Sequence, residues 1–384
     1  MNYRKMRSAG LGMMIATSLG CGSSVPGAEE PPTDAGMTDG TETRDAAGAT
    51  DMGLGPIERM LAMIERDVDP SYVYEYEGAR FVPPEGRTLL VLGQTLDGID
   101  AHVESFPDEP GPGGWAAYWG IPSMDGVDRE IVTEEGSRHN HQELVERFPN
   151  TALQSGLWMV GTWDVARRTA DGEFDAIVRD FSTWAKTVAR PIYLRIGYEF
   201  DGPHNELEPE DYIAAYRRIV DITREEGVEN VAFVWHSYAA APYDGNPISA
   251  WYPGGDYVDW VAVSLFGQSY ASSPGRFADD VFEFARENRK PVMIAEASPI
   301  RGITAESTDA WDDWFANVFS LAYERNVKAI SIINENWENF AGSEWEDARL
   351  QNNATIAEAF FAETSAERYL KQSDELFEQL GFAP

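Results

Sequence analysis

The sequence predicts an α/β protein with alternating strands and helices. Eight short apolar runs occur between residues 88 and 334, and stretches with helical apolar spacing lie between them. The runs show no alternation of polar and apolar residues, which is typical of strands buried on both faces of a parallel sheet. Eight strand–helix units favour a closed (β/α)8 TIM barrel over an open sheet.

The predicted elements follow one another at regular spacing. The eight strands are expected at residues 89–94, 115–120, 156–161, 191–197, 230–236, 260–266, 291–295 and 329–334. An apolar residue at every third or fourth position predicts helices over 174–186, 212–226, 277–288 and 308–325. A short amphipathic helix (57–66) comes before the barrel, and residues 355–380 supply a closing helical segment.

Residues 1–21 predict a signal for export. Arg4 to Arg7 form a basic start, residues 9–19 are apolar, and Gly20 stands directly before Cys21. This arrangement resembles a bacterial lipoprotein signal, in which Cys21 is lipidated and anchors the exported protein in a membrane. The leucine usual three places before the cysteine is a serine here. An ordinary export signal that contains an incidental thiol is the alternative.

Composition separates a linker from the folded domain. Residues 22–53 contain no aromatic residue, leucine or isoleucine, so this segment is predicted to be a disordered acidic linker. Residues 54–384 are predicted to form the folded domain. The formal net charge of −35 argues against nucleic-acid binding. Cys21 is the only cysteine, so the domain needs neither a disulfide nor a catalytic thiolate. We expect a monomer without a cofactor.

Two glutamates stand at the ends of predicted strands. Glu199 and Glu296 each follow an apolar run, where a buried carboxylate is costly unless it is used. They are 97 residues apart, close to three units of about 31 residues, so we expect them on the fourth and seventh strands. Two carboxylates that face one cleft are the apparatus of a glycosidase. The alternative for either glutamate alone is a structural role, as a cap of a neighbouring helix or in an ion pair with an arginine. Arg195 lies four residues before Glu199, on the same side of a strand.

The segment 195–202, Arg-Ile-Gly-Tyr-Glu-Phe-Asp-Gly, resembles the strand-four motif of glycoside hydrolase family 26, the β-mannanase family of barrel enzymes. Further similar segments follow in the same order at 212–220, 230–235, 251–259, 290–296, 336–337 and 345–350. The resemblance implies a retaining hydrolase with Glu199 as acid/base and Glu296 as nucleophile. It implies a β-linked polysaccharide substrate, with β-mannan first and β-glucan or β-xylan next.

The chain departs from the family pattern at specific positions. The histidine before the acid/base is Tyr198 here, and the asparagine two residues after it is Asp201. Residues 264–266 replace the Asp-Tyr expected at the end of strand six, and Tyr270 is the candidate for the missing tyrosine. These changes affect the expected sugar contacts and therefore the substrate more than the chemistry. They leave open a glycan-binding lipoprotein that has lost catalysis.

Aromatic residues make up 12% of the chain, and sugar rings stack on aromatic faces. Trp337, just after the eighth strand, is the first candidate for a sugar platform. The further candidates are Trp163, Trp235 and Trp251, for which a place in the core is the alternative. His236 ends the fifth strand and either bonds a sugar hydroxyl or is a satisfied buried histidine. Arg195, Tyr198 and Tyr270 complete the predicted substrate-binding set.

No metal site is expected. His139 and His141 lie in a polar stretch that offers no evident third ligand.

Overall fold

The computed structural model describes residues 54–133, 136–159, 164–239, 246–266, 275–339 and 345–383. The predicted signal, Cys21 and the linker lie outside the described residues, as do Trp163 and Tyr270, so the predictions for them stay predictions. In the part of the chain that is described, no helix has the length and apolarity needed to cross a bilayer.

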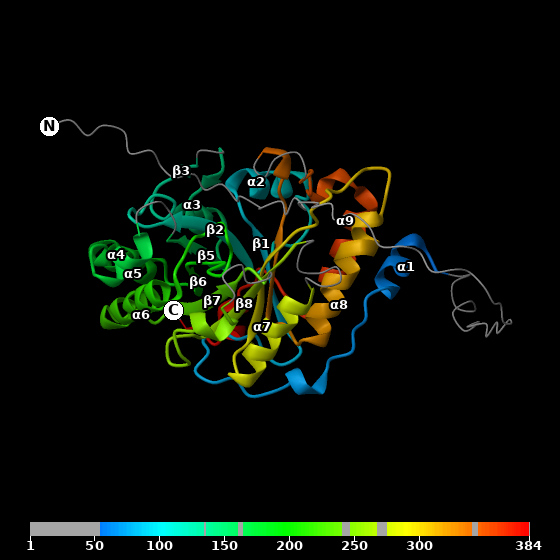
Figure 1. The fold of residues 1–384 in the computed structure, drawn as a ribbon. Coiled ribbons are helices and arrows are strands. Elements are labelled where there is room, and N and C mark those ends of the chain that lie inside the picture. Colours follow the sequence, from blue (N-terminus) through cyan, green and yellow to red (C-terminus); the bar gives the residue numbers. More distant parts are fainter. Residues whose placement is uncertain are drawn as a thin grey trace, which may run out of the picture.

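The described residues contain eight parallel strands that close into a barrel, which confirms the predicted fold class (Figure 1). Each strand pairs with the next along the chain, and the last pairs with the first through the register Leu89–Ala329 to Gly93–Ile333. The strands are β1 (Thr88–Gly93), β2 (Gly114–Gly120), β5 (Ala152–Trp158), β6 (Ile192–Ile196), β7 (Val231–Ser237), β8 (Trp260–Leu265), β9 (Val292–Ala297) and β10 (Ala329–Ile333).

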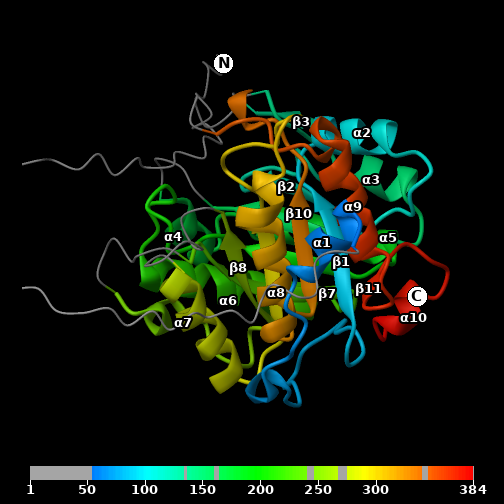
Figure 2. The same cartoon turned by 90° about the vertical axis from the view of Figure 1, so that its right-hand side faces the viewer.

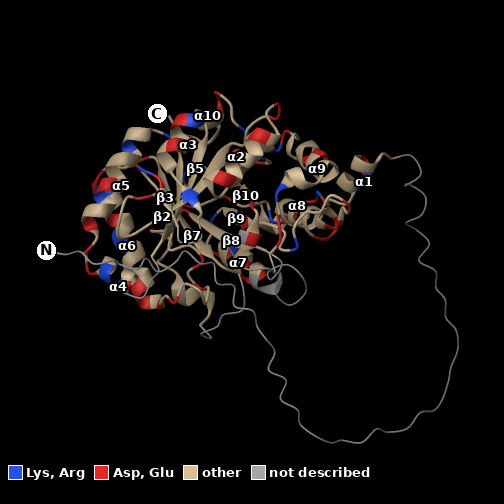
Figure 3. Ribbon diagram, turned by 90° about the horizontal axis from the view of Figure 1, so that it is seen from above, with Lys and Arg blue, Asp and Glu red and all other residues tan. Residues whose placement is uncertain are grey.

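Helices surround this barrel. They are α2 (Leu96–Ser105), α3 (His141–Arg147), α4 (Val165–Ala170), α5 (Asp175–Val188), α6 (Pro209–Glu225), α7 (Gly275–Glu287), α8 (Ala316–Glu324) and α9 (Ala354–Thr364). Helix α1 (Pro56–Ala62) packs beside α9 at the edge of the barrel (Figure 2). In the view from above, acidic residues fall mainly on the outer helices and the loops, so the outside of the domain carries much of its negative charge (Figure 3).

The predicted start of the third strand is wrong for a physical reason. Strand β5 begins at Ala152, four residues before the predicted start, because the two polar residues that interrupt its apolar run find partners on opposite faces of the strand. Gln154 Nε2 donates to the carbonyl of Ala295 at 2.7 Å, and Ser155 Oγ accepts from Trp119 Nε1 at 3.0 Å.

The closing segment 355–380 is not one helical stretch. After α9 the chain forms the short strand β11 (Tyr369–Leu370), which pairs with β1, and then α10 (Leu376–Gln379). Leu370, Leu376 and Phe81 pack into the apolar interior at the amino end of the barrel. A short hairpin of β3 (Ile131–Val132) and β4 (Arg138–His139), which the sequence did not predict, lies between β2 and α3.

Alternate residues of each strand belong to two different apolar layers, as the period of a β-strand requires. On β1, for example, Leu89 and Val91 belong to the barrel interior, whereas Leu90 and Leu92 pack against the surrounding helices. The interior is apolar near the amino ends of the strands. Towards their carboxyl ends the inward residues become polar, and this is the end where barrel active sites lie.

Candidate active site

Six buried polar side chains meet inside the barrel near the carboxyl ends of its strands. They come from β2, β6, β7, β8 and β9 and from the turn after β6: Tyr118, Arg195, Glu199, His236, Ser264 and Glu296. Strands β6 and β9 are the fourth and seventh strands of the barrel, as the 97-residue spacing predicted. The structure therefore brings together both predicted carboxylates, Arg195 and His236.

Glu296 is 3% exposed and receives two donors on one oxygen. Arg195 Nη1 donates to Glu296 Oε1 at 2.5 Å, and the hydroxyl of Tyr118 donates its single proton to the same oxygen at 2.5 Å. The Tyr118 oxygen also lies 2.5 Å from the side-chain amide of Gln94. Burial raises the pKa of Glu296, and the nearby charge of Glu199 raises it further, while the bonds from Arg195 and Tyr118 oppose this rise. The two donors favour the ionised carboxylate that a nucleophile needs.

A β-bulge aims Glu296 into the barrel. Met293 and Ala295 belong to the interior layer, so strict alternation would turn residue 296 outward. The pairing of β8 with β9 instead steps from Val263–Ile294 to Ser264–Glu296 and leaves one extra residue on β9. A bulge of this kind re-aims the side chain that follows it.

Arg195 is fully buried and lies between two aromatic rings. Its guanidinium carbon is 4.9 Å from the ring centroid of Tyr118 and 5.3 Å from that of Tyr198. Gly156 on the neighbouring strand β5 leaves room for this packing, since a Cβ there would come within 2.5 Å of the Tyr118 ring and 2.9 Å of Arg195 Nη2. The carboxylate that Arg195 binds is that of Glu296.

Glu199 does not lie on a strand, so the expectation that it shares a strand face with Arg195 is wrong. Strand β6 ends at Ile196, and Glu199 adopts a left-handed backbone with φ of 53°. Such a backbone is unusual for a residue with a Cβ and is held by its surroundings. Asn205 Nδ2 supplies this hold by donating to the carbonyls of Tyr198 at 2.8 Å and Glu199 at 2.7 Å.

A series of donors connects Arg195 to Glu199. Ser264 Oγ donates to Glu199 Oε1 at 2.5 Å, so it accepts from His236 Nε2, which lies 3.0 Å away. His236 Nδ1 then faces Arg195 Nη1 at 3.3 Å as an acceptor, because a guanidinium only donates. Burial and the charge of Arg195 hold the pKa of His236 well below its usual value, so the ring is neutral. Both ring nitrogens of His236 thus contact protein groups. This agrees with the second predicted role, a satisfied buried histidine, and not with a sugar contact.

Sequence reasoning missed Tyr118 and His204. Tyr118, on β2, places a tyrosine hydroxyl beside the nucleophile, which is the kind of contact predicted for Tyr270. The signal was an aromatic residue near the carboxyl end of a predicted strand, two positions after the inward Ala116. His204 Nε2 lies 2.8 Å from Glu199 Oε2. The only sequence signal for His204 was its position five residues after Glu199.

The remaining predicted residues are divided between the site and the core. Tyr198 is half-buried, and its ring lies edge-on to that of Tyr118 with centroids 5.0 Å apart. Trp337 follows β10 but is 1% exposed, and its Nε1 donates to Ser298 Oγ at 2.8 Å. Its role as a sugar platform stays a prediction.

The structure does not bring Trp235 to the site. It is fully buried in the layer between barrel and helices, stacked on Phe200 and edge-on to Tyr252, and its Nε1 donates to the carbonyl of Trp251. Strand alternation places its neighbour His236 inside the barrel and Trp235 outside it. Because Trp235 lies in this outer layer, away from the polar site inside the barrel, it is reassigned to the core, as is Trp251, which packs in the same layer.

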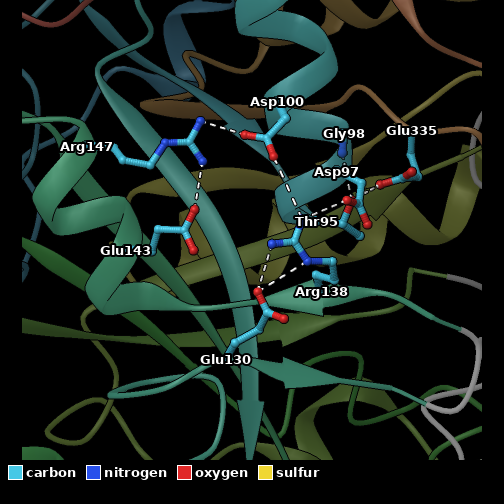
Figure 4. A network of polar contacts seen from close by, with 9 residues as sticks. All are labelled: Thr95, Asp97, Gly98, Asp100, Glu130, Arg138, Glu143, Arg147 and Glu335. Carbon is cyan, nitrogen blue, oxygen red and sulfur yellow. Dashed lines mark hydrogen bonds and ion pairs between the residues drawn. The ribbon is translucent and has the colours of Figure 1, made fainter.

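A polar network connects α2 to the segments next to it at the rim of the barrel (Figure 4). Thr95 Oγ1, at the start of α2, donates to Glu335 Oε2 at 2.5 Å, and Glu335 directly follows Asn334 at the end of β10. Burial raises the pKa of Glu335 to about 7. Two arginines connect α2 to the β3–β4 hairpin and to α3 through ion pairs with acidic partners: Arg138 with Asp97, Asp100 and Glu130, and Arg147 with Asp100 and Glu143.

The described residues contain no group of three or more side chains that could hold a metal ion. His139 and His141 are buried, where the sequence suggested a polar loop, and each has its Nδ1 beside a backbone carbonyl, that of Gln94 or Gly126.

The chain is similar to known carbohydrate-active proteins. Residues 188–338, which include Glu199 and Glu296, match the family model described as glycosyl hydrolase family 26. The chain is 28% identical over 330 residues to the β-1,3-xylanase TXYA of a Vibrio species, covering 79% of this chain and 70% of that protein. Identity to a β-1,3-xylanase of an Alcaligenes species is 27% over 330 residues, covering 79% and 68%. A double mutant of Cellulomonas fimi endo-β-1,4-mannanase shares the fold, with a TM-score of 0.54 at 18% identity, covering 76% of this chain and 73% of that chain.

Proposed function

The chain carries a glycoside hydrolase family 26 domain, and we propose that this domain cleaves a β-linked polysaccharide with retention of the anomeric configuration. The observation that carries the proposal is the meeting of Glu199 and Glu296 through Ser264. The Ser264 hydroxyl bonds Glu199, while its backbone pairs in register with Glu296. Neighbouring strands lie about 4.8 Å apart, so this arrangement suits the separation of roughly 5–5.5 Å between the carboxyl groups of a retaining enzyme.

In the first step Glu296 attacks the anomeric carbon as the glycosidic bond breaks, and Glu199 gives its proton to the leaving oxygen. This forms a covalent ester between Glu296 and the sugar. In the second step Glu199 takes a proton from water, whose oxygen attacks the same carbon and releases Glu296 as a carboxylate. Arg195 and Tyr118 bond the oxygen of Glu296 on which charge reappears, so they favour this release.

We propose β-1,3-xylan as the first substrate, ahead of the β-mannan that the family resemblance suggested. The β-1,3-xylanases are similar to this chain over 79% of its length at 27–28% identity. The mannanase structure matches at 18% identity, which supports the fold alone. The replacement of the mannanase histidine by Tyr198 agrees with a different sugar contact next to the acid/base.

The test measures new reducing ends on β-1,3-xylan, β-1,4-xylan, β-mannan, mixed-linkage glucan and cellulose. We expect activity on β-1,3-xylan that falls by at least about a thousandfold in both Glu199→Gln and Glu296→Gln, because each variant removes one half of the acid/base and nucleophile pair. NMR of the freshly released sugar should show the β-anomer first.

Each other outcome has a defined meaning. Release of the α-anomer would refute retention, and full activity in either variant would refute that glutamate's role. Binding to one polymer without cleavage would support the alternative, a glycan-binding protein that has lost catalysis.

We also propose that the chain is exported and anchored through Cys21. The support is the basic start and apolar stretch of residues 1–21. Incorporation of labelled palmitate in a bacterial host should disappear in Cys21→Ser, and equal labelling of both proteins would exclude this anchor.

A further inference from the structure

We propose that His204 is a positioning residue that shares the proton of the acid/base Glu199, so that the pair and not the carboxyl alone carries the proton used in catalysis. The catalytic part of this inference rests on the proposed function. The shared proton itself is a property of the folded protein and is tested without a substrate.

The geometry holds Glu199 against His204. His204 Nε2 lies 2.8 Å from Glu199 Oε2, and the side chains are 8% and 2% exposed. The two atoms are close enough for an ion pair, but their orientation does not meet the geometry of a hydrogen bond. The other oxygen, Oε1, is fixed by the 2.5 Å bond from Ser264. The carboxylate therefore faces a hydroxyl donor on one oxygen and an imidazole nitrogen on the other.

The backbone presents His204 at this point. The loop after β6 turns through Gly202, where a Cβ would lie 2.5 Å from His204 Cε1, so a side chain at that position would displace the ring. The ring of Tyr238, just after the end of β7, lies edge-on to the imidazole with centroids 5.0 Å apart. Asp201, in the same turn, is held by bonds from Ser237 Oγ and the Tyr238 amide.

The surrounding charges favour a cationic imidazole. Burial alone lowers the pKa of His204, but the close contact with the Glu199 carboxylate outweighs it, and the net shift is upward. Glu296 on β9 and Asp201 add smaller contributions in the same direction. The groups that face His204 from the packed elements are thus carboxylates and the phenol of Tyr238.

A shared proton suits both steps of a retaining mechanism. With one proton on the pair, it resides either on Glu199, which then acts as acid, or on His204, which leaves Glu199 as a carboxylate. When the leaving oxygen takes the proton, the pair is left with none. When Glu199 then accepts a proton from water, the pair regains one, so the balance closes over one turnover.

The first experiment follows the histidine ring carbons by NMR as a function of pH in the purified full chain. The chain has five histidines. Burial lowers the pKa of His102 to about 4, of His139 to about 3 and of His141 to about 4, and that of His236 well below its usual value. We therefore expect one imidazole, His204, to titrate above the ordinary histidine value of about 6.5.

In Glu199→Gln this titration should move to lower pH, because burial remains while the charge of the nearest carboxylate is gone. A His204 titration that is unchanged in Glu199→Gln would overturn the proposal. Because this measurement needs no substrate, it also decides the question if the chain proves to have no hydrolase activity.

The second experiment compares pH profiles of kcat/KM for His204→Gln and for the matched control His102→Gln, which replaces a buried histidine on α2 outside the site. Imidazole is intrinsically more basic than a carboxyl group by about two units. For each protein we compare the ratio of kcat/KM at pH 8 to kcat/KM at pH 5.5. This ratio should be about tenfold or more lower in His204→Gln than in the wild type.

The control should keep the wild-type profile. A His204→Gln profile that superimposes on the wild type, in a protein with wild-type circular dichroism, would refute the shared proton. Lower activity at every pH with an unchanged profile would reduce His204 to a structural role and would refute it equally.

Discussion

Replacing Tyr118 by phenylalanine removes one of the two donors to the nucleophile. The substitution removes the hydroxyl, which donates to Glu296 Oε1 at 2.5 Å and also lies 2.5 Å from Gln94 Oε1, and it leaves Arg195 as the other donor to Glu296. A hydrogen bond to a charged group contributes about 1.5–3 kcal/mol. At about 1.36 kcal/mol per factor of ten, its loss corresponds to a decrease in kcat of about 10- to 150-fold.

The decrease should fall mainly on the second step. In the glycosyl-enzyme the Glu296 oxygen belongs to an ester, and it regains negative charge only as the sugar leaves. The Tyr118 bond therefore strengthens in the transition state of deglycosylation. We expect Tyr118→Phe to accumulate glycosyl-enzyme, seen as a burst of the first product and as a mass increase of the protein. Because the Tyr118 bond opposes the upward shift in the pKa of Glu296, its loss should also move the acidic limb of the pH profile to higher pH.

Tyr193→Phe is the matched control. Tyr193 is also fully buried in the barrel, and its hydroxyl donates to the carbonyl of Phe81 at 2.6 Å, towards the amino end of β6. This control should lose about 1 kcal/mol of stability and keep its kcat. A kcat of Tyr118→Phe within twofold of wild type, without a burst, would show that the bond does not act in the second step.

Two further predictions concern buried charge. Arg195→Met leaves the Glu296 carboxylate buried without its cation, so the free energy of unfolding, measured by urea denaturation, should fall by about 3–5 kcal/mol. Adding Glu296→Gln should restore part of that loss. If the effects of the two substitutions are simply additive, the ion pair is contradicted. The folded pKa of Glu335 is about 7 against an ordinary 4.5, so the unfolded chain binds fewer protons between these values and stability falls as pH rises through that window. The free energy of unfolding of Glu335→Gln, relative to that of the wild type, should therefore be about 3 kcal/mol higher at pH 8 than at pH 4. If the difference between variant and wild type is the same at both pH values, this assignment is refuted.

Much of the fold was accessible from local pattern. Eight apolar runs at regular spacing are enough to predict eight strands, because a parallel strand buried on both faces needs apolar residues at nearly every position. The error at β5 arose where Gln154 and Ser155 interrupt the run, since their partners Ala295 and Trp119 lie on other strands. The strand β11 was missed because two residues carry no periodicity, and only pairing with β1 defines it.

The sequence by itself determined that Glu199 and Glu296 belong to the fourth and seventh strand–loop units of the barrel, since a spacing of 97 residues corresponds to three barrel units. Tertiary structure decided where those side chains point. The bulge in β9 turns Glu296 inward, and the contacts of Asn205 hold Glu199 in a left-handed turn.

Only the closed barrel brings Tyr118 to Glu296, because the two residues lie 178 positions apart. In the same way, whether Trp235 or His236 faces the interior depends on how β7 sits between β6 and β8. A run that is buried on both faces offers no polar alternation from which that choice can be read.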